Sequence, residues 1–166
     1  MVEMMTSTIS LPENIMKHLR RAAKAQGLSL EEYLIEYAVK DLDPVDSARE
    51  YIVASKQLIE DAHKEFMAGD LRQAAEKLWG ALALAVKAYA GFRDGRRLSS
   101  HRDLWEYKDR VIEDLGEWVR DVWNTGNSMH TCFYEGWCTR RDVEKAIDRI
   151  TRLVDEIWGR IMRGKE

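Results

Sequence analysis

One histidine of the chain stands among side chains that could hold or transfer a proton. His130 lies in the segment NSMHTCFYE, between Asn127 and Tyr134. An imidazole changes charge near neutral pH, so it can act as a general acid or base when its neighbours orient it. The alternative is a histidine and a tyrosine that pack and hydrogen-bond at a junction between helices. The residues alone favour this structural interpretation over the catalytic one.

A second histidine opens a helical pattern beside a group of arginines. Ser100 and Asp103 are suited to cap this helix, and His101 lies in its first turn. Guanidinium groups near a helix N-terminus can hold a phosphate, although charged loops are more often only solvated. We expect His101 and His130 to lie near one another, with the basic loop 93–97 beside them. The expected ligand is a small anion, and the residues expected to bind it are His101, Asp103, Arg93, Arg96, Arg97, Arg102, Asn127 and Tyr134.

Neither the cysteines nor an isolated lysine predicts a catalytic or metal site. Cys132 and Cys138 follow His130 with the spacing H-x-C-x5-C, which lacks a fourth zinc ligand. Two cysteines are also too few for a fold held by disulfides, so we expect two buried thiols and no metal. Lys87 stands alone in an apolar helix, where it is expected to snorkel or to pair with a carboxylate rather than to catalyse.

The composition describes a chain that can bury a core and remain soluble. It has 166 residues, of which 45% are apolar and 33% charged, with a formal net charge of −3. One domain, or a domain with a small appendage, fits this length. The sequence has no apolar run of the roughly 18 residues that a membrane helix needs, and no export signal at its start. We therefore expect a cytoplasmic protein that does not contact membranes. It also lacks the basic surplus of a duplex-DNA binder.

The first 43 residues predict a small unit of one strand and two helices. The segment MTSTISL, residues 5–11, alternates apolar and hydroxyl side chains, which favours a short strand. A helix follows from Pro12 and stops at Gly27. Ser29 and Glu32 then form a capping-box pattern that opens a second helix.

Residues 44–166 predict an antiparallel bundle of about four or five long helices. The helix that begins at Asp70 is apolar nearly all round in LWGALALAVKAYA, so it belongs in the centre of the bundle. Gly116 is expected to bend or split a later helix, and the residues 124–127 to break it. The closing helix has apolar residues alternately four and three positions apart, which is the seam of a packed helix. The side chains expected to be among the most buried are Leu82, Val86, Ile147, Ile150 and Val154.

Several segments of this bundle resemble the HEPN superfamily. The segment GDLRQAAEKLWGALALAVKAYAG resembles its second helix, SHRDL resembles the opening of the next, and TRRDVEKAIDRITRLVDEI resembles the closing helix. Within the superfamily, AAEKLWGA, HRDLW and MHTCFYEGW are most similar to the PaREP-type proteins of thermophilic archaea. The resemblance covers about Asp46 to Arg163, and it implies an all-α antiparallel helical bundle.

The resemblance also bears on catalysis. HEPN proteins with ribonuclease activity carry an arginine with four to six residues between it and the catalytic histidine. Upstream of His130 these positions are Trp123, Asn124 and Thr125, and the nearest arginine is Arg120, farther away than the pattern requires. A nuclease is therefore kept only as an alternative in which His130 acts with Arg120 or with an arginine of the basic loop.

The N-terminal segment STISLPENIMKHLRRAAKAQGLSLEEYLIEYAV resembles a ribbon–helix–helix module. In that fold the strands of two chains pair, and alternate strand residues, here Thr6, Thr8 and Ser10, read the DNA major groove. No lysine or arginine lies on this strand, and Glu31 and Glu32 stand where helix N–H groups would meet phosphate. The resemblance therefore implies a dimerisation element more than a DNA reader.

Together these features predict a non-enzymatic HEPN-like protein without a cofactor. It is expected to act as a homo-oligomer and to bind an anion or nucleotide, RNA or a partner protein. Two alternatives stay open. One is a metal-independent endoribonuclease of the toxin type that uses His130, and the other is a DNA-binding regulator that uses residues 1–43.

Overall fold

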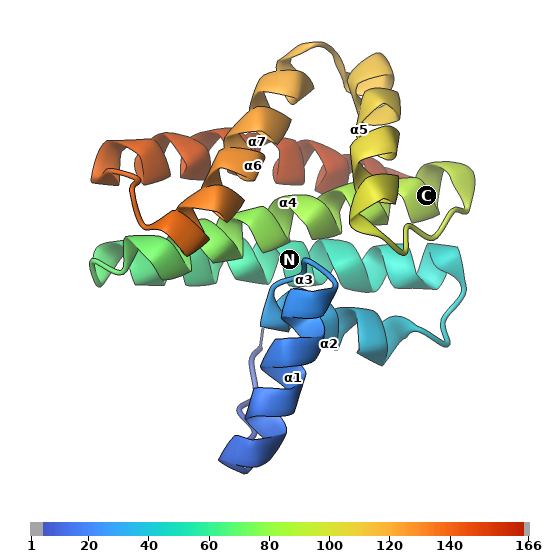
Figure 1. Cartoon of the computed structure of the whole chain (residues 1–166). Helices are drawn as coiled ribbons and strands as arrows, with labels where there is room; N and C mark the ends of the chain where they lie inside the picture. The colour runs from blue at the N-terminus through green and yellow to red at the C-terminus, as the bar shows by residue number, and fades with distance from the viewer. Residues whose placement is uncertain (1–4, 165–166) are drawn as a thin grey trace.

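The structure, a computed structural model, describes residues 5–164, which form seven helices (Figure 1). Two shorter helices come first, and five long ones follow. Their bounds are α1 Glu13–Ala25, α2 Leu30–Val39, α3 Pro44–Met67, α4 Leu71–Asp94, α5 His101–Leu115, α6 Trp118–Glu135 and α7 Arg140–Arg163. The prediction of an all-helical bundle of long helices is confirmed.

Short polar side chains set the start of most helices. The side chains of Ser29, Asp43, Asp70 and Ser100 each accept a hydrogen bond from a backbone N–H of the first turn that they precede. Thr139 and Asp142 form a reciprocal capping box at the start of α7. These contacts satisfy N–H groups that have no partner within a helix. These caps therefore mark the start of five helices, including α5, which carries His101, whereas α1 and α6 begin without a side-chain cap.

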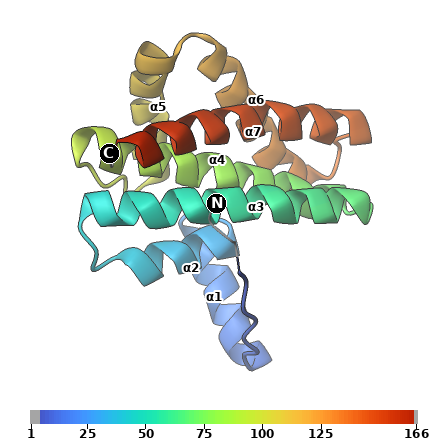
Figure 2. The ribbon, with the colours of Figure 1, turned by 180° about the vertical axis from the view of Figure 1, so that it is seen from behind.

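Helix α4 forms the centre of the bundle. Every residue from Ala74 to Gly91 except Lys77 is buried, as expected for a helix that is apolar nearly all round. Helix α3 lies antiparallel to it on one side, and α6 and α7 cover the other (Figures 1 and 2). The five side chains predicted to be among the most buried, Leu82, Val86, Ile147, Ile150 and Val154, are all at most 4% exposed.

Two glycines allow helices to approach α4 closely. A Cβ on Gly91 of α4 would overlap the carbonyl oxygen of Pro44 at the start of α3. A Cβ on Gly126 of α6 would overlap the side chain of Leu82. Gly126 therefore serves helix packing, and the break predicted at residues 124–127 is wrong, because α6 runs unbroken from Trp118 to Glu135. The predicted split at Gly116 is confirmed, since this residue ends α5 at a φ of 117°.

The N-terminal unit is helical but has no strand. Residues 5–12 are neither helix nor strand, and the described part of the chain contains no strand at all. The strand predicted over Met5–Leu11 is therefore wrong for this single chain. A strand needs a second strand for its backbone N–H and C=O groups, and the described residues supply none. Helix α1 packs against α2 and projects away from the bundle (Figures 1 and 2).

None of the helices described here combines the length and the apolar composition needed to cross a membrane.

Candidate functional site

The two histidines of the bundle lie side by side. His101 begins α5 and His130 lies near the end of α6, and their ring centroids are 6.3 Å apart. The prediction that they lie near one another is confirmed. The ring of Trp79, from the central helix α4, contacts both imidazoles, at 5.7 Å from His101 and 5.2 Å from His130. Three helices thus meet at one histidine–tryptophan cluster.

A buried carboxylate completes the cluster. Glu76, one turn before Trp79 on α4, is only 5% exposed, and its Oε2 lies 3.4 Å from Nδ1 of His130. The distance allows an ion pair, but neither atom has a hydrogen-bond partner of good geometry. A buried carboxylate oxygen without a hydrogen-bond donor is unfavourable. Glu76 is therefore suited to accept a hydrogen bond from a group outside the cluster.

Tyr134 connects the cluster with the surface. Its ring stands edge-on to the imidazole of His130, 5.3 Å away, and its side chain is half-exposed. Burial of part of the ring and the charge of Glu76 raise the pKa of Tyr134. Arg72 of α4 donates to the carbonyl oxygens of Phe133 and Tyr134, at 2.9 Å and 3.0 Å, and so fixes the last turn of α6.

His101 is held in its neutral form. Nε1 of Trp105 donates to its Nε2 at 2.8 Å, which requires a deprotonated acceptor nitrogen. Burial, the neighbouring charge of His130 and that of Lys87 lower the pKa of His101. The cluster thus places a neutral imidazole beside a second imidazole that faces a carboxylate. Chemically, such a group can hold or pass a proton.

The arginines predicted to bind an anion have other partners. Arg93 contacts Asp114 at 2.9 Å, and Arg97 donates to the carbonyl oxygens of Val39 and Leu42 at the end of α2. Arg102 pairs with Glu106, and Arg120 pairs with Glu117 and Asp109. In the described chain none of these guanidinium groups contacts either imidazole. The structure therefore separates the basic loop from the histidines, which the sequence placed together.

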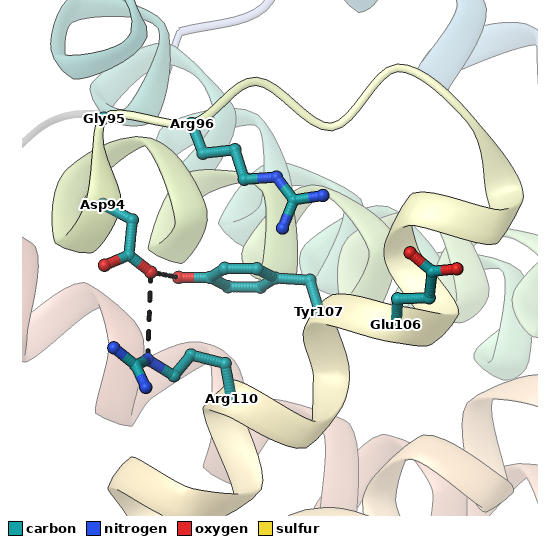
Figure 3. Close-up of a pocket in the computed structure, with 6 residues that line it drawn as sticks. All are labelled: Asp94, Gly95, Arg96, Glu106, Tyr107 and Arg110. Atoms are coloured by element: carbon teal, nitrogen blue, oxygen red, sulfur yellow. Dashed lines mark hydrogen bonds and ion pairs between the residues drawn. The ribbon is translucent and has the colours of Figure 1, made fainter.

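Arg96 lines a different cavity. Figure 3 shows it on one face of the Tyr107 ring, with its guanidinium carbon 5.9 Å from the ring centroid. The hydroxyl of Tyr107 donates to Asp94 at 2.7 Å, and Arg110 approaches the same carboxylate at 3.9 Å. This open cavity, of about 570 Å³, therefore has mixed charge.

The other predicted site residues have structural roles. Asp103 accepts from the backbone N–H of Ser99, and this hydrogen bond is the largest of the effects that lower the pKa of Asp103. The carbonyl oxygen of Asn127 accepts from the hydroxyl of Thr131 within α6. Neither contact brings a functional group into the histidine cluster.

The expected partner of Lys87 comes from the N-terminal unit. Its Nζ lies 2.9 Å from Glu32 and 2.6 Å from Glu36, both on α2. The prediction that Lys87 pairs with a carboxylate is confirmed. Spacing alone does not identify this partner, because Lys87 and Glu32 are separated by 55 positions.

The two cysteines form a disulfide, so the prediction of two separate thiols is wrong. Cys132 lies in the last turn of α6 and Cys138 precedes α7, with their Cα atoms 5.6 Å apart, a normal distance for a disulfide. The left-handed turn at Gly136, with a φ of 70°, returns the chain so that the side chains meet. Among the described residues, no group of three or more His, Cys, Asp or Glu side chains could hold a metal ion.

The fold and the site define a helical-bundle protein in which the central helix places a buried carboxylate beside one of two neighbouring histidines. The chain belongs to the archaeal PaREP1/PaREP8 family, whose model matches residues 50–154. This range includes Glu76, Trp79, His101 and His130, and it begins after the N-terminal unit. The resemblance to PaREP-type proteins is thereby confirmed. No curated protein and no solved structure matches the chain.

Proposed function

We propose that this protein acts by assembly and ligand binding rather than by catalysis, as a HEPN-like bundle that oligomerises through its N-terminal unit. One observation carries the assembly proposal. Residues 5–11 form a segment that is neither helix nor strand, and its backbone makes no hydrogen bond with the rest of the described chain. Its apolar side chains are solvent-exposed, with Met5 at 86% and Ile9 at 81%.

A second copy of the same segment is the partner that fits best. Two extended segments that pair antiparallel satisfy each other's N–H and C=O groups. Their alternating side chains then place Met5, Ile9 and Leu11 of both copies on one face. This pairing is the two-stranded ribbon of a ribbon–helix–helix module, and the exposed Ile15 of α1 extends its apolar surface.

Sedimentation equilibrium tests this assembly. The wild-type protein is expected to have the mass of two chains or more at micromolar concentration, and Ile9→Glu is expected to shift it to one chain. Val45→Glu is the matched control, since Val45 is an exposed apolar residue, at 53%, in the first turn of α3. A wild-type mass of one chain, or an Ile9→Glu mass equal to that of wild type, would contradict the proposal.

The contacts of the histidine cluster support binding more than turnover. The charged partner of His130 is the carboxylate of Glu76, and the nearest upstream arginine, Arg120, pairs with Glu117 and Asp109. Phosphoryl-transfer transition states carry negative charge that cationic groups stabilise. A carboxylate in place of a guanidinium therefore disfavours RNA cleavage at this place.

A ribonuclease is the second candidate, because two neighbouring imidazoles could serve as acid and base. The test is incubation of the purified protein with total RNA, followed by electrophoresis. We expect no cleavage. If wild type cuts RNA and His130→Ala is slower by about 10²–10⁴-fold, the ribonuclease proposal replaces ours.

A further inference from the structure

A cleft lies between the N-terminal unit and the bundle, next to the histidine cluster. Its volume is about 380 Å³, within the range of about 300–1,000 Å³ that is usual for small-molecule sites. The walls come from α1, α2, α4 and α6, four helices that are separate in the sequence. The charged and aromatic residues that line it are Arg20, Lys24, Glu31, Glu76, Phe133 and Tyr134.

The inner end of the cleft accepts hydrogen bonds. Glu76 lines it and is 95% buried, and its Oε2 faces Nδ1 of His130 at 3.4 Å without a hydrogen bond of good geometry. A carboxylate in this state favours a ligand that brings N–H groups, since each new charge-assisted hydrogen bond replaces lost hydration. The ligand is therefore expected to present hydrogen-bond donors at its buried end.

One wall of the cleft is aromatic. Phe133 and Tyr134 lie against each other with their ring centroids 5.0 Å apart, and both line the cavity. The two hydrogen bonds from Arg72 to their carbonyl oxygens hold them in place. Aromatic side chains of this kind offer flat apolar surfaces on which a planar ring can stack.

The outer rim of the cleft is basic. Arg20 and Lys24 are exposed residues one turn apart on α1, and both line the cavity. Arg20 contacts Glu13 at 3.2 Å, but both side chains are more than half-exposed, so the pair is weak and can be exchanged. Glu31 also lines the cavity, but its carboxylate pairs with Nζ of Lys77 at 3.0 Å. The two cations of α1 therefore oppose entry of an organic cation and favour a ligand with an anionic tail.

We infer that this cleft binds a guanine nucleotide. The guanine edge presents two adjacent donor groups, which a single carboxylate such as Glu76 can accept together. Adenine places an acceptor nitrogen beside its amino group, and this nitrogen would face the carboxylate unfavourably. The purine ring lies against Phe133 and Tyr134, and the phosphate lies at Arg20 and Lys24. The inference rests on the proposed binding function and names its ligand class.

Isothermal titration calorimetry of the full chain with GMP tests the inference, with AMP, guanosine and inorganic phosphate as comparison probes. GMP is expected to bind more tightly than AMP by about tenfold or more. Glu76→Gln is expected to remove this preference. Arg20→Ala with Lys24→Ala should weaken GMP and leave guanosine unchanged, whereas Arg21→Ala, an exposed arginine on the same helix outside the cleft, should change neither.

A variant at an exposed position keeps the test valid if Glu76→Gln does not fold. Tyr134 is 42% exposed, so Tyr134→Ala should fold and still weaken GMP by about tenfold through lost stacking. Equal affinity for AMP and GMP, competition by phosphate alone, or no binding of GMP would each overturn the inference. The sedimentation mass distinguishes failure of the ligand assignment from failure of the assembly proposal, because residues 5–11 do not line the cleft. A dimer that does not bind GMP contradicts only the ligand assignment.

Discussion

Nζ of Lys87 lies 2.9 Å from Oε1 of Glu32, at a point where both side chains are almost completely buried. Glu36 shares the same ammonium group at 2.6 Å and also accepts from the hydroxyl of Tyr51 at 3.0 Å. Burial alone would lower the pKa of Lys87, but the charges of Glu32 and Glu36 raise it. Burial raises the pKa of Glu32, and the charge of Lys87 opposes this increase. This network joins α2 to the central helix.

Removing the cation from this network should be costly. Lys87→Met leaves Glu32 buried without its charged partner, so we expect the free energy of unfolding to fall by about 3–5 kcal/mol. Chemical denaturation with circular dichroism measures it. Lys77→Met is the matched control, because Lys77 pairs with the half-exposed Glu31 and should lose about 1 kcal/mol or less. The double variant Lys87→Met with Glu32→Gln should recover part of the loss, and equal losses for the two single lysine variants would contradict the network's role.

The lowered pKa of His101 predicts a pH dependence of stability. The folded protein favours the neutral imidazole, so the unfolded chain takes up the proton first as the pH falls. Stability from this residue is therefore full above the ordinary histidine pKa of about 6.5 and decreases below it. We expect the unfolding free energy of wild type, relative to that of His101→Asn, to fall between about pH 7 and pH 5. Parallel curves for the two proteins would show that His101 does not cause the effect.

The disulfide predicts a redox-dependent stability. Cys132 and Cys138 are separated by six positions, and closing so short a loop stabilises a fold by about 2 kcal/mol in the chain-entropy account. Addition of a reductant should lower the melting temperature of wild type and leave that of Cys132→Ser with Cys138→Ser unchanged. Titration of the unfolded, unreduced protein with a thiol reagent gives an independent measurement. Two reactive thiols in that sample would mean that the bond does not form.

The close contact of α4 with α3 predicts a position that tolerates no side chain. Gly91→Ala places a methyl group against the backbone carbonyl of Pro44, which cannot rotate away. We expect a loss of about 1–3 kcal/mol, although alanine favours a helix over glycine by about 1 kcal/mol. Gly159→Ala in α7 is the control, because there the nearest atom belongs to the flexible end of Arg163. Thermal melts should show destabilisation in the first variant and none in the second.

The helices could be predicted largely because their signals are local. Ser29, Asp43, Asp70, Ser100 and Thr139 mark helix starts by contacts within three residues, and a helix buried on all sides is visible as a continuous apolar run. The strand over Met5–Leu11 was predicted wrongly, because alternating apolar and polar side chains indicate only that one face of a segment is apolar. A strand also requires a partner strand, and the described residues of this chain contain none.

The site was predicted only in part, for a related reason. The sequence marked His101 and His130 by residue type, and their proximity followed from the order of the helices. Glu76 was missed, although a carboxylate in an otherwise buried helix could have indicated it. The arginines of the basic loop were misplaced because their partners, such as the end of α2 for Arg97, are determined by tertiary packing. Spacing gives no information on contacts of that range.

The position of α4 has a consequence for the order of events during synthesis. The chain leaves the ribosome from its N-terminus, so α4 emerges when α3 is present but α5, α6 and α7 are not. Only one side of this apolar helix can then be covered, by the α3 hairpin that precedes it. Until α7 has emerged, some seventy residues later, the other side is open to chaperones or to the nascent chains of neighbouring ribosomes.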